Sequence, residues 1–523
     1  MLDDDPVKIP ADLLVHGGRI YPLGRFGLRP VTHLAISRGR VLAAGGREVQ
    51  DLRGRQTAIL DLAGGAALPG FDDAHAHLVY NGLSSFWANL ERVSGVPELQ
   101  ARLRRHADRL PPGEWALARG YSALEMREGR PPTRTELDAA TGSRPCFVDE
   151  RGGHSRVANS AALAAAGITP ATPDPPGGAI GRDADGAPDG RLLEVAMRLV
   201  ADVQPPPSLA RRREGILRSQ RLLLSRGVTS AGAAVNRGFA DDLRAYQQLL
   251  DSGRLRLRVN AFLSWELLEA AAELGLGTRF GGERLRAGPI KVFVDGEAGA
   301  GHAALRGDGG TWRTPPDELA QIVSRADTAG LQVAAHAIGD AAVEAMCDAV
   351  AGAGPAAGSR RHRVEHCSVC PPDLQRRLAE LGMAAVMQPL FLRLGRDRAL
   401  QIFGADRAGS VAAHRELLRA GVAVAFSSDL PVVPDPNPWP GLALAVLDDL
   451  HPLTPLQALR AYTAGGAWVA HQEGWRGSLE PGQVADLQVY RGDPISAGPR
   501  SWNERLRPST VLVGGAVAFR ARS

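Results

Sequence analysis

Residues 66–77 read AALPGFDDAHAH, an apolar run that ends in two histidines spaced one residue apart. The apolar start predicts a buried β-strand. Residues i and i+2 of a strand point to the same face, so the HxH spacing would aim both imidazoles at one point. The sequence therefore predicts a strand with two candidate metal ligands, His75 and His77, at its carboxyl end.

Seven further apolar segments follow, each next to a helical pattern. They are GVTSAGA (227–233), LRLRVNAFL (255–263), GPIKVFVDG (288–296), LQVAAHAIGD (331–340), RHRVEHCSV (361–369), MAAVMQP (383–389) and GVAVAFSSD (421–429). Eight strand–helix units predict an α/β protein with a closed parallel barrel, the (β/α)8 or TIM-barrel architecture. Residues 66–473 are assigned to this barrel.

Two parts of the chain do not fit the barrel repeat. Residues 80–219 hold helical patterns at 97–110, 159–167 and 209–227 and the loop TPDPPGG, which predicts an insertion over the barrel mouth that shapes substrate access. Residues 1–65 and 474–523 alternate with period two between Gly-Gly and Pro-Gly turns. That pattern predicts a small composite β-sandwich domain formed by both termini.

Composition narrows the function classes. The net charge of +4 is spread over 523 residues without a block of like charge, so no nucleic-acid partner is expected. The acidic start lacks the apolar core of a signal peptide, and no run reaches the roughly 18 apolar residues of a membrane span. Four cysteines do not make a disulfide framework, and Cys367-x-x-Cys370 is expected as free thiols. A cytoplasmic enzyme with a small-molecule substrate is expected, and a homodimer is the oligomeric state considered.

Polar residues end several of the predicted barrel strands, where active sites of this fold lie. Besides the HxH pair, these are His336, His366 and Asp429. Taken alone, each could be structural: a hydrogen-bonded histidine at a strand end, or, for Asp429, a helix cap. Together, four imidazoles and a carboxylate suit zinc and similar divalent ions, so they predict a metal centre.

Lys291 is unusual because the chain has only one other lysine, Lys8, against 59 arginines. Burial and a nearby cation lower the pKa of a lysine. The neutral amine can add CO₂ to give a carbamate that bridges two metal ions, which arginine cannot do. The alternative is a buried lysine paired with Asp295, and Cys367 is a weaker candidate for the bridge.

Five motifs in this order resemble the amidohydrolase superfamily: GFDDAHAHL, IKVFVDG, HAIGD, RHRVEH and FSSDLPV. The stretches ARGYS (118–122), residues 130–168 and residues 172–194 are similar to its YtcJ-like branch, amidohydrolase family 3, which includes N-substituted formamide deformylases. The resemblance implies a distorted barrel with a composite β-sandwich. It also implies that His75, His77, His336, His366 and Asp429 bind metal and that Lys291 is the carbamylated bridge.

The resemblance adds roles and shows departures. Asp429 would relay protons, and His154 in GGHS would face the substrate from the insertion. The stretch DGEAGAGH departs from the branch, so Glu297 and His302 would reshape the pocket. Ser122 stands where the branch usually has Asp, and AGAAV (231–235) where an acidic residue is common.

The resulting hypothesis is hydrolysis of a C–N bond other than a peptide bond, in an amide or N-formyl/N-acyl amine, by a metal-bound hydroxide. The expected cofactor is a divalent metal, two zinc ions with iron, manganese or nickel left open, plus a CO₂-derived carbamate. Asp429 and Lys291 would be catalytic. The expected substrate contacts are His154, Tyr121, Arg119, Gln388 and His302. The alternatives are a mononuclear deaminase or cyclic-amide hydrolase, and an inactive scaffold that keeps this fold.

Overall fold

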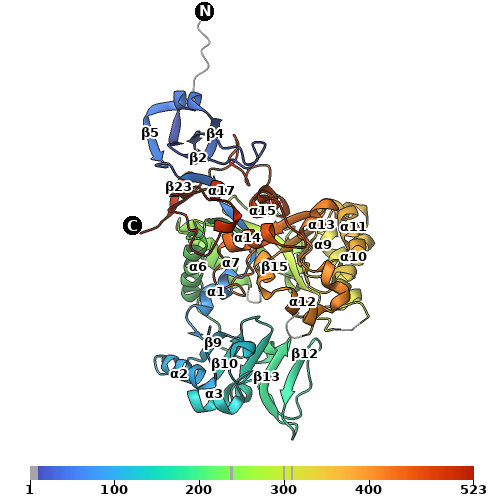
Figure 1. Cartoon of the computed structure of the whole chain (residues 1–523). Coiled ribbons are helices and arrows are strands. Elements are labelled where there is room, and N and C mark those ends of the chain that lie inside the picture. The colour runs from blue at the N-terminus through green and yellow to red at the C-terminus, as the bar shows by residue number, and fades with distance from the viewer. Residues whose placement is uncertain (1–9, 236–238, 298–300, 308–309, 523) are drawn as a thin grey trace, which may run out of the picture.

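The computed structural model describes residues 10–522, apart from 236–238, 298–300 and 308–309. Its centre is an eight-stranded parallel sheet in the order β20-β19-β18-β17-β16-β15-β14-β7 (Figure 1). Each strand falls on a predicted segment. The strands are β7 (Phe71–Ala76), β14 (Val228–Ala233), β15 (Arg258–Ser264), β16 (Leu285–Phe293), β17 (Val333–Ala337), β18 (Arg363–His366), β19 (Ala384–Met387) and β20 (Ala423–Phe426).

The sheet closes where its first and last strands meet. The backbone N–H of Asp429 donates to the carbonyl of His75 at 2.9 Å, and the N–H of His77 donates to the carbonyl of Leu430 at 2.7 Å. These bonds lie at the carboxyl end of both strands. The predicted (β/α)8 barrel is therefore confirmed, and its closure lies at the level of the candidate ligands.

Helices alternate with the strands and bury one face against them. In α9 (Pro316–Thr328), Leu319, Ile322, Val323 and Ala326 are buried at the spacing of an amphipathic helix. The other helices between barrel strands are α6 (Leu209–Leu224), α7 (Phe239–Asp251), α8 (Leu268–Glu273), α10 (Asp340–Ala353), α11 (Pro372–Glu380), α12 (Arg396–Phe403) and α13 (His414–Arg419). After β20, the chain forms α14 (Pro438–Leu447), α15 (Pro455–Ala461) and α16 (Ala464–Val469).

The insertion has its own six-stranded sheet, in the order β12-β13-β11-β10-β9-β8. The strands are β8 (Ala88–Asn89), β9 (Ala116–Tyr121), β10 (Cys146–Glu150), β11 (Ser155–Ala158), β12 (Gly178–Arg182) and β13 (Pro188–Glu194). Helices α2 (Val96–Ala107), α3 (Arg134–Thr141) and α4 (Ser160–Ala165) accompany it. The prediction for the insertion contained helices and a loop but not this sheet. Helix α6, whose first part was assigned to the insertion, instead packs on α1 (Leu78–Ser84) as a barrel helix.

Both termini contribute to a pair of smaller sheets, ordered β4-β3-β1-β5 and β2-β6-β21-β22-β23. One buried cluster joins Val15 and Leu34 of the first end to Leu487 and Leu512 of the second. The strands are β1 (Ala11–His16), β2 (Arg19–Ile20), β3 (His33–Ser37), β4 (Arg40–Gly45), β5 (Arg53–Asp61), β6 (Ala66–Pro69), β21 (Leu487–Tyr490), β22 (Thr510–Val513) and β23 (Ala516–Arg520).

The prediction of one strand at 66–77 is wrong, because this segment forms two strands, β6 and β7. β6 pairs with β21 in a terminal sheet, whereas β7 belongs to the barrel. Gly70 separates them, and a Cβ there would lie 2.2 Å from Thr229 Oγ1, so the close approach requires glycine.

The terminal sheets and the insertion lie at opposite ends of the molecule, with the barrel between them (Figure 1). Among the described residues, no helix is long and apolar enough to cross a membrane.

Candidate metal centre

Two histidines and a carboxylate meet where the barrel closes. His75 and His77 come from the end of β7, and Asp429 follows β20. Asp429 Oδ1 lies 3.6 Å from His75 Nε2 and 3.4 Å from His77 Nε2. One potential ligand atom from each residue lies within 4.8 Å of the other two, which is a spacing that one ion could span.

His336 and His366 extend this group along the barrel mouth. His336 is the penultimate residue of β17 and His366 is the last residue of β18, and their ring centroids are 4.6 Å apart. The ring of His366 is 5.3 Å from that of His75. The four predicted histidines thus form one continuous group of imidazoles, although their residue numbers span nearly 300 positions.

The backbone is left-handed at two of these positions, with φ of 74° at His366 and 55° at Asp429. Non-glycine residues seldom adopt this conformation because Cβ crowds the backbone. Such residues concentrate at functional sites, where the surrounding structure enforces them. Both positions carry candidate ligands, which agrees with that tendency.

Lys291 lies on β16 and is only 2% exposed. Its Nζ is 4.5 Å from the ring centre of Phe293. Burial lowers the pKa of Lys291 to about 8, which favours the neutral amine relative to a solvated lysine. The side chain is therefore close to the state that CO₂ addition requires.

The alternative pairing of Lys291 with Asp295 is not found. The carboxylate of Asp295 accepts backbone N–H groups from Ala304, Ile338 and Gly339 at 3.0, 3.1 and 2.9 Å. Within the described part of the chain, Lys291 Nζ has no hydrogen-bond partner.

Several other buried polar atoms share this property: His77 Nδ1, His336 Nε2 and Asp429 Oδ1 have no hydrogen-bond partner among the described residues. Leaving such a group unpaired costs about 1–3 kcal/mol. Burial also lowers the pKa of His75 to about 3 and the pKa of His336 and His366 below the usual range. Neutral imidazoles and free lone pairs are the state that metal binding requires, so the donor set fits a divalent ion.

Two of the histidines are held by neighbours that fix which nitrogen faces the group. Glu365 Oε2 accepts a hydrogen bond from His75 Nδ1 at 2.5 Å, and Arg363 holds that carboxylate. Gln388 Oε1 lies 2.9 Å from His366 Nδ1. Both contacts leave Nε2 free, as is typical of the residues that orient metal-binding histidines.

This arrangement adds a second role to Gln388. The other end of its amide donates to Ser427 Oγ at 2.8 Å, so both ends are engaged within the protein and the residue supports His366. Its contact with substrate stays a prediction. Sequence reasoning missed the role of Glu365. Glu365 directly precedes the predicted ligand His366, and this was the available signal in the sequence. Consecutive strand residues point to opposite faces, so the signal did not indicate that Glu365 would contact a histidine of the site.

Of the residues predicted in the insertion, His154 reaches the barrel mouth, with its ring centroid 5.5 Å from that of His336. Tyr121 does not, because it is fully buried in the core of the insertion. Arg119 Nη2 donates to the carbonyl of Pro431 at 2.9 Å, which ties β9 to the loop after Asp429. These contacts make Tyr121 a packing residue and Arg119 a link between the insertion and the barrel.

His302 approaches this region through Glu194, a residue that sequence reasoning did not single out. Glu194 Oε1 lies 3.3 Å from His302 Nδ1, and Oε2 lies 2.8 Å from His154 Nδ1. Burial disfavours charge on both Glu194 and His154. The attraction between the two groups outweighs burial, so the pKa of Glu194 is lowered and the pKa of His154 is raised. The predicted Glu297 is half-buried beside them, and residues 298–300 of the same stretch lie outside the described residues.

The four cysteines are free and buried, as expected. Cys367 packs in the barrel core with Cys370, and the ligand atoms that gather around Asp429 come from histidines. Cys367 is therefore a poor candidate for the bridge.

Comparison with known proteins agrees with this geometry. A family model described as "Amidohydrolase family" matches residues 58–519. The chain is 27% identical to putative amidohydrolase YtcJ of Bacillus subtilis, covering 96% of this chain and 98% of that protein. It is 28% identical to N-substituted formamide deformylase of Arthrobacter pascens, covering 92% and 94%.

A solved structure gives the same result. An uncharacterized metal-dependent hydrolase from Pyrococcus horikoshii superposes with a TM-score of 0.77 at 29% identity, over 94% of this chain and 100% of that one. The predicted resemblance to the YtcJ-like branch is confirmed, and the chain belongs to the amidohydrolase family.

Proposed function

We propose that the protein is a metal-dependent hydrolase of a C–N bond other than a peptide bond, in an amide or an N-formyl/N-acyl amine. The observation that carries the proposal is the group of buried, unpaired polar atoms on Lys291, His77, His336 and Asp429. The name of the Arthrobacter relative, an N-substituted formamide deformylase, supports the substrate class. The Pyrococcus structure, described as a metal-dependent hydrolase, supports the cofactor.

The proposed ligands are the six residues of the predicted set: His75, His77, Lys291, His336, His366 and Asp429. Nitrogen and carboxylate donors suit zinc, and the same donors also accept iron, manganese or nickel. A divalent ion bound there supplies a Lewis acid that polarises a carbonyl and lowers the pKa of water toward about 7.

Lys291 enters this set as a carbamate. Its neutral Nζ would attack the carbon of CO₂, forming an N–C bond while one C=O π pair moves to oxygen, and one amine proton would leave to solvent. The product is an anion with two oxygens, which would replace a buried amine that has no hydrogen-bond partner by a metal ligand. Burial, which lowers the pKa of Lys291, and the absence of a hydrogen-bond partner for its Nζ in the described residues both support this reaction.

Asp429 is the proposed proton carrier. Its carboxylate would take a proton from the attacking water and pass it to the nitrogen of the leaving amine, first as a general base and then as a general acid. The turn that carries Asp429 is held rigidly, because Asp73 Oδ1 accepts the N–H of Ser428 at 2.9 Å and Asp73 also accepts from its hydroxyl. A fixed carboxylate suits a transfer between two nearby atoms.

His154 would orient the substrate from the insertion side. Its Nδ1 is engaged with Glu194, so Nε2 is the ring nitrogen left to contact a substrate carbonyl or amine. This is the proposed reason why a residue of the insertion lies next to His336.

The experiment is metal analysis of the purified protein followed by hydrolysis assays on a panel of N-formyl and N-acyl amines. Chelation should abolish hydrolysis and added zinc, iron, manganese or nickel should restore it. Hydrolysis that survives complete metal removal would contradict the mechanism.

Cyclic amides and aminopurines in the same panel test the alternative of a deaminase or cyclic-amide hydrolase. The resemblance to the amidohydrolase superfamily implies that a deaminase would carry a Glu shortly after His336. The first Glu after His336 is Glu344, which is paired with Arg306, and this counts against the deaminase alternative.

A further inference from the structure

Glu194 is the last residue of β13 and is buried, with 3% exposure and a left-handed φ of 51°. A buried carboxylate needs several donors to compensate for lost water. Glu194 takes them from two separate parts of the chain. His154 belongs to the insertion, whereas His302 and Arg313 belong to the segment between β16 and α9 of the barrel.

The contacts of Glu194 use both of its oxygens. Oε2 lies 2.8 Å from His154 Nδ1 and 3.2 Å from Arg313 Nη1. Oε1 lies 3.3 Å from His302 Nδ1 and 3.3 Å from the backbone nitrogen of Glu297. A carboxylate has about four acceptor positions, so this one is fully used within the protein. Glu194 is therefore not available to bind a ligand itself.

The two parts approach closely around this cluster, at two positions that are glycine. A Cβ on Gly152 would lie 2.5 Å from Glu297 Oε1. A Cβ on Gly296 would lie 2.9 Å from Glu194 Oε1 and 2.6 Å from His302 Cβ. Two glycines, one from each side, thus allow the loop of His154 to pack directly on the barrel.

The cluster also reaches the candidate metal centre. His154 lies beside His336, and the guanidinium of Arg313 is 4.4 Å from the ring of Phe293, which Lys291 approaches from 4.5 Å. A shift of Glu194 would therefore move groups that neighbour two proposed ligands. No other described residue accepts a hydrogen bond from the side chain of His154.

We propose that Glu194 is a positioning residue that fixes His154 beside His336 and so makes the insertion a working part of the active site. Glu194 acts through His154 and does not touch the substrate. The claim about catalysis rests on the proposed function, whereas the claim about the position of His154 does not.

The experiment compares Glu194→Ala and Glu194→Gln with a matched control, Asp149→Asn. Asp149 forms another buried ion pair of the insertion, with Arg156 at 2.6 Å, and among the described residues its side-chain hydrogen bonds go to Arg156 and Tyr80, outside the Glu194 cluster. Crystal structures of the metal-loaded variants report the position of His154. In Glu194→Ala, its ring should leave its place next to His336 while the other histidines stay. In Asp149→Asn it should remain.

Kinetics on the best substrate of the panel give the second measurement. Glu194→Gln should lower kcat by about 10–100-fold, the range typical of an outer partner of an active-site group, with a smaller change in KM. Combining Glu194→Gln with His154→Gln should give no further loss of kcat, because both substitutions disrupt the same Glu194–His154 interaction. Asp149→Asn should lower stability and combine additively with His154→Gln.

Two results would overturn the proposal: a ring of His154 that stays in place in Glu194→Ala, or losses of kcat that multiply in the double variant. If no substrate of the panel is hydrolysed, the proposed function fails. The crystal structures still decide whether Glu194 positions His154.

Discussion

Both ends of the barrel hold buried charged residues, but the two ends differ in how those residues are paired. At the end that faces the terminal sheets, Arg476 pairs with Asp72, and Arg258 donates to both oxygens of Asp486 at 2.6 and 2.9 Å. At the mouth, Lys291 Nζ, His336 Nε2 and Asp429 Oδ1 have no hydrogen-bond partner among the described residues. The ion pairs at the first end hold parts of the protein together, whereas the atoms at the mouth remain free to accept a ligand.

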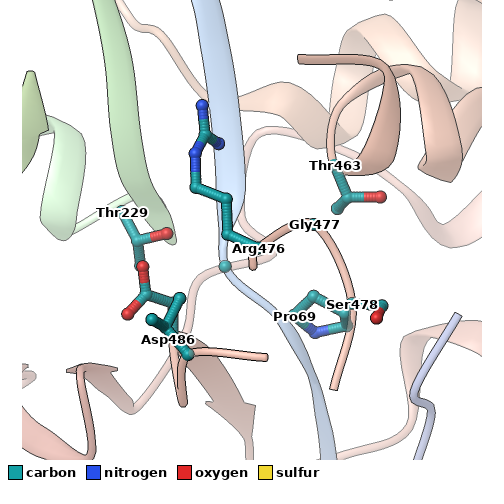
Figure 2. Close-up of a pocket in the computed structure, with 9 residues that line it drawn as sticks. Pro69, Thr229, Thr463, Arg476, Gly477, Ser478 and Asp486 are labelled. Carbon is teal, nitrogen blue, oxygen red and sulfur yellow. The ribbon is translucent and has the colours of Figure 1, made fainter. Parts of the chain in front are cut away.

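Figure 2 shows the first end in detail. Arg476, Asp486 and Thr229 line a small polar pocket together with Pro69 and Ser478, between the barrel and the terminal sheet. The guanidinium of Arg476 extends away from Pro69 and Ser478 (Figure 2), and its partner Asp72 lies at the start of β7. A concave polar site is therefore not sufficient evidence of catalysis, because here the charges satisfy one another.

The strongest test of this contrast is Asp429→Asn. The amide keeps the size of the side chain but cannot carry a proton from water to the amine. We expect kcat to fall by about 10²–10⁴-fold, the usual contribution of general acid–base catalysis. Steady-state kinetics on metal-saturated protein measure the loss, and a decrease below tenfold would remove Asp429 from the proton transfer.

Lys291→Arg keeps a cation over Phe293 but cannot form a carbamate. We expect one of the two proposed ions to be lost and kcat/KM to fall by at least about 10²-fold, above the range for outer-shell partners. Elemental mass spectrometry measures the number of metal ions bound per chain. An unchanged metal content would show that Lys291 does not bridge, whatever happens to activity.

Glu365→Gln tests the support of His75. The substitution removes the charge that holds Nδ1–H while keeping the side chain nearly isosteric. We expect metal affinity to fall by about 10–100-fold. Competition with a chelator measures the affinity, and equal affinities in both proteins would contradict the assigned role.

Asp72→Asn should have the smallest effect on activity. It leaves Arg476 buried without its partner, which costs about 3–5 kcal/mol of the free energy of unfolding. We expect kcat/KM to stay within about twofold of the original protein. Denaturant unfolding and kinetics are measured on the same sample. A large kinetic effect with normal stability would mean that this end of the barrel is also part of the active site.

The sequence predicted the barrel and its candidate ligands because both depend on local signals. Each barrel strand is a short apolar run, and His336 and Asp429 occur where such runs end. The closed barrel then brings these ends together. Lys291 could be singled out only because arginine replaces lysine almost everywhere else in the chain.

The insertion sheet gave no such signal. β8 has two residues, and β12 and β13 contain glycine or proline, so their pairing depends on distant partners and not on local preference. Glu194 was missed for the same reason, because Arg313 lies 119 residues away along the chain. The support that Gln388 gives to His366 was also missed, because a strand-end amide does not reveal in sequence which side chains its two ends will contact.

The closure of the barrel between β7 and β20 has a consequence for biosynthesis. His77 and Asp429 are separated by about 350 residues, which a ribosome adds in roughly 20 to 70 s at typical rates. Throughout that time the first two histidines have been made and their carboxylate partner has not. The complete set of proposed ligands therefore exists only after most of the chain has been made, and binding of a metal there would be one of the last steps in maturation.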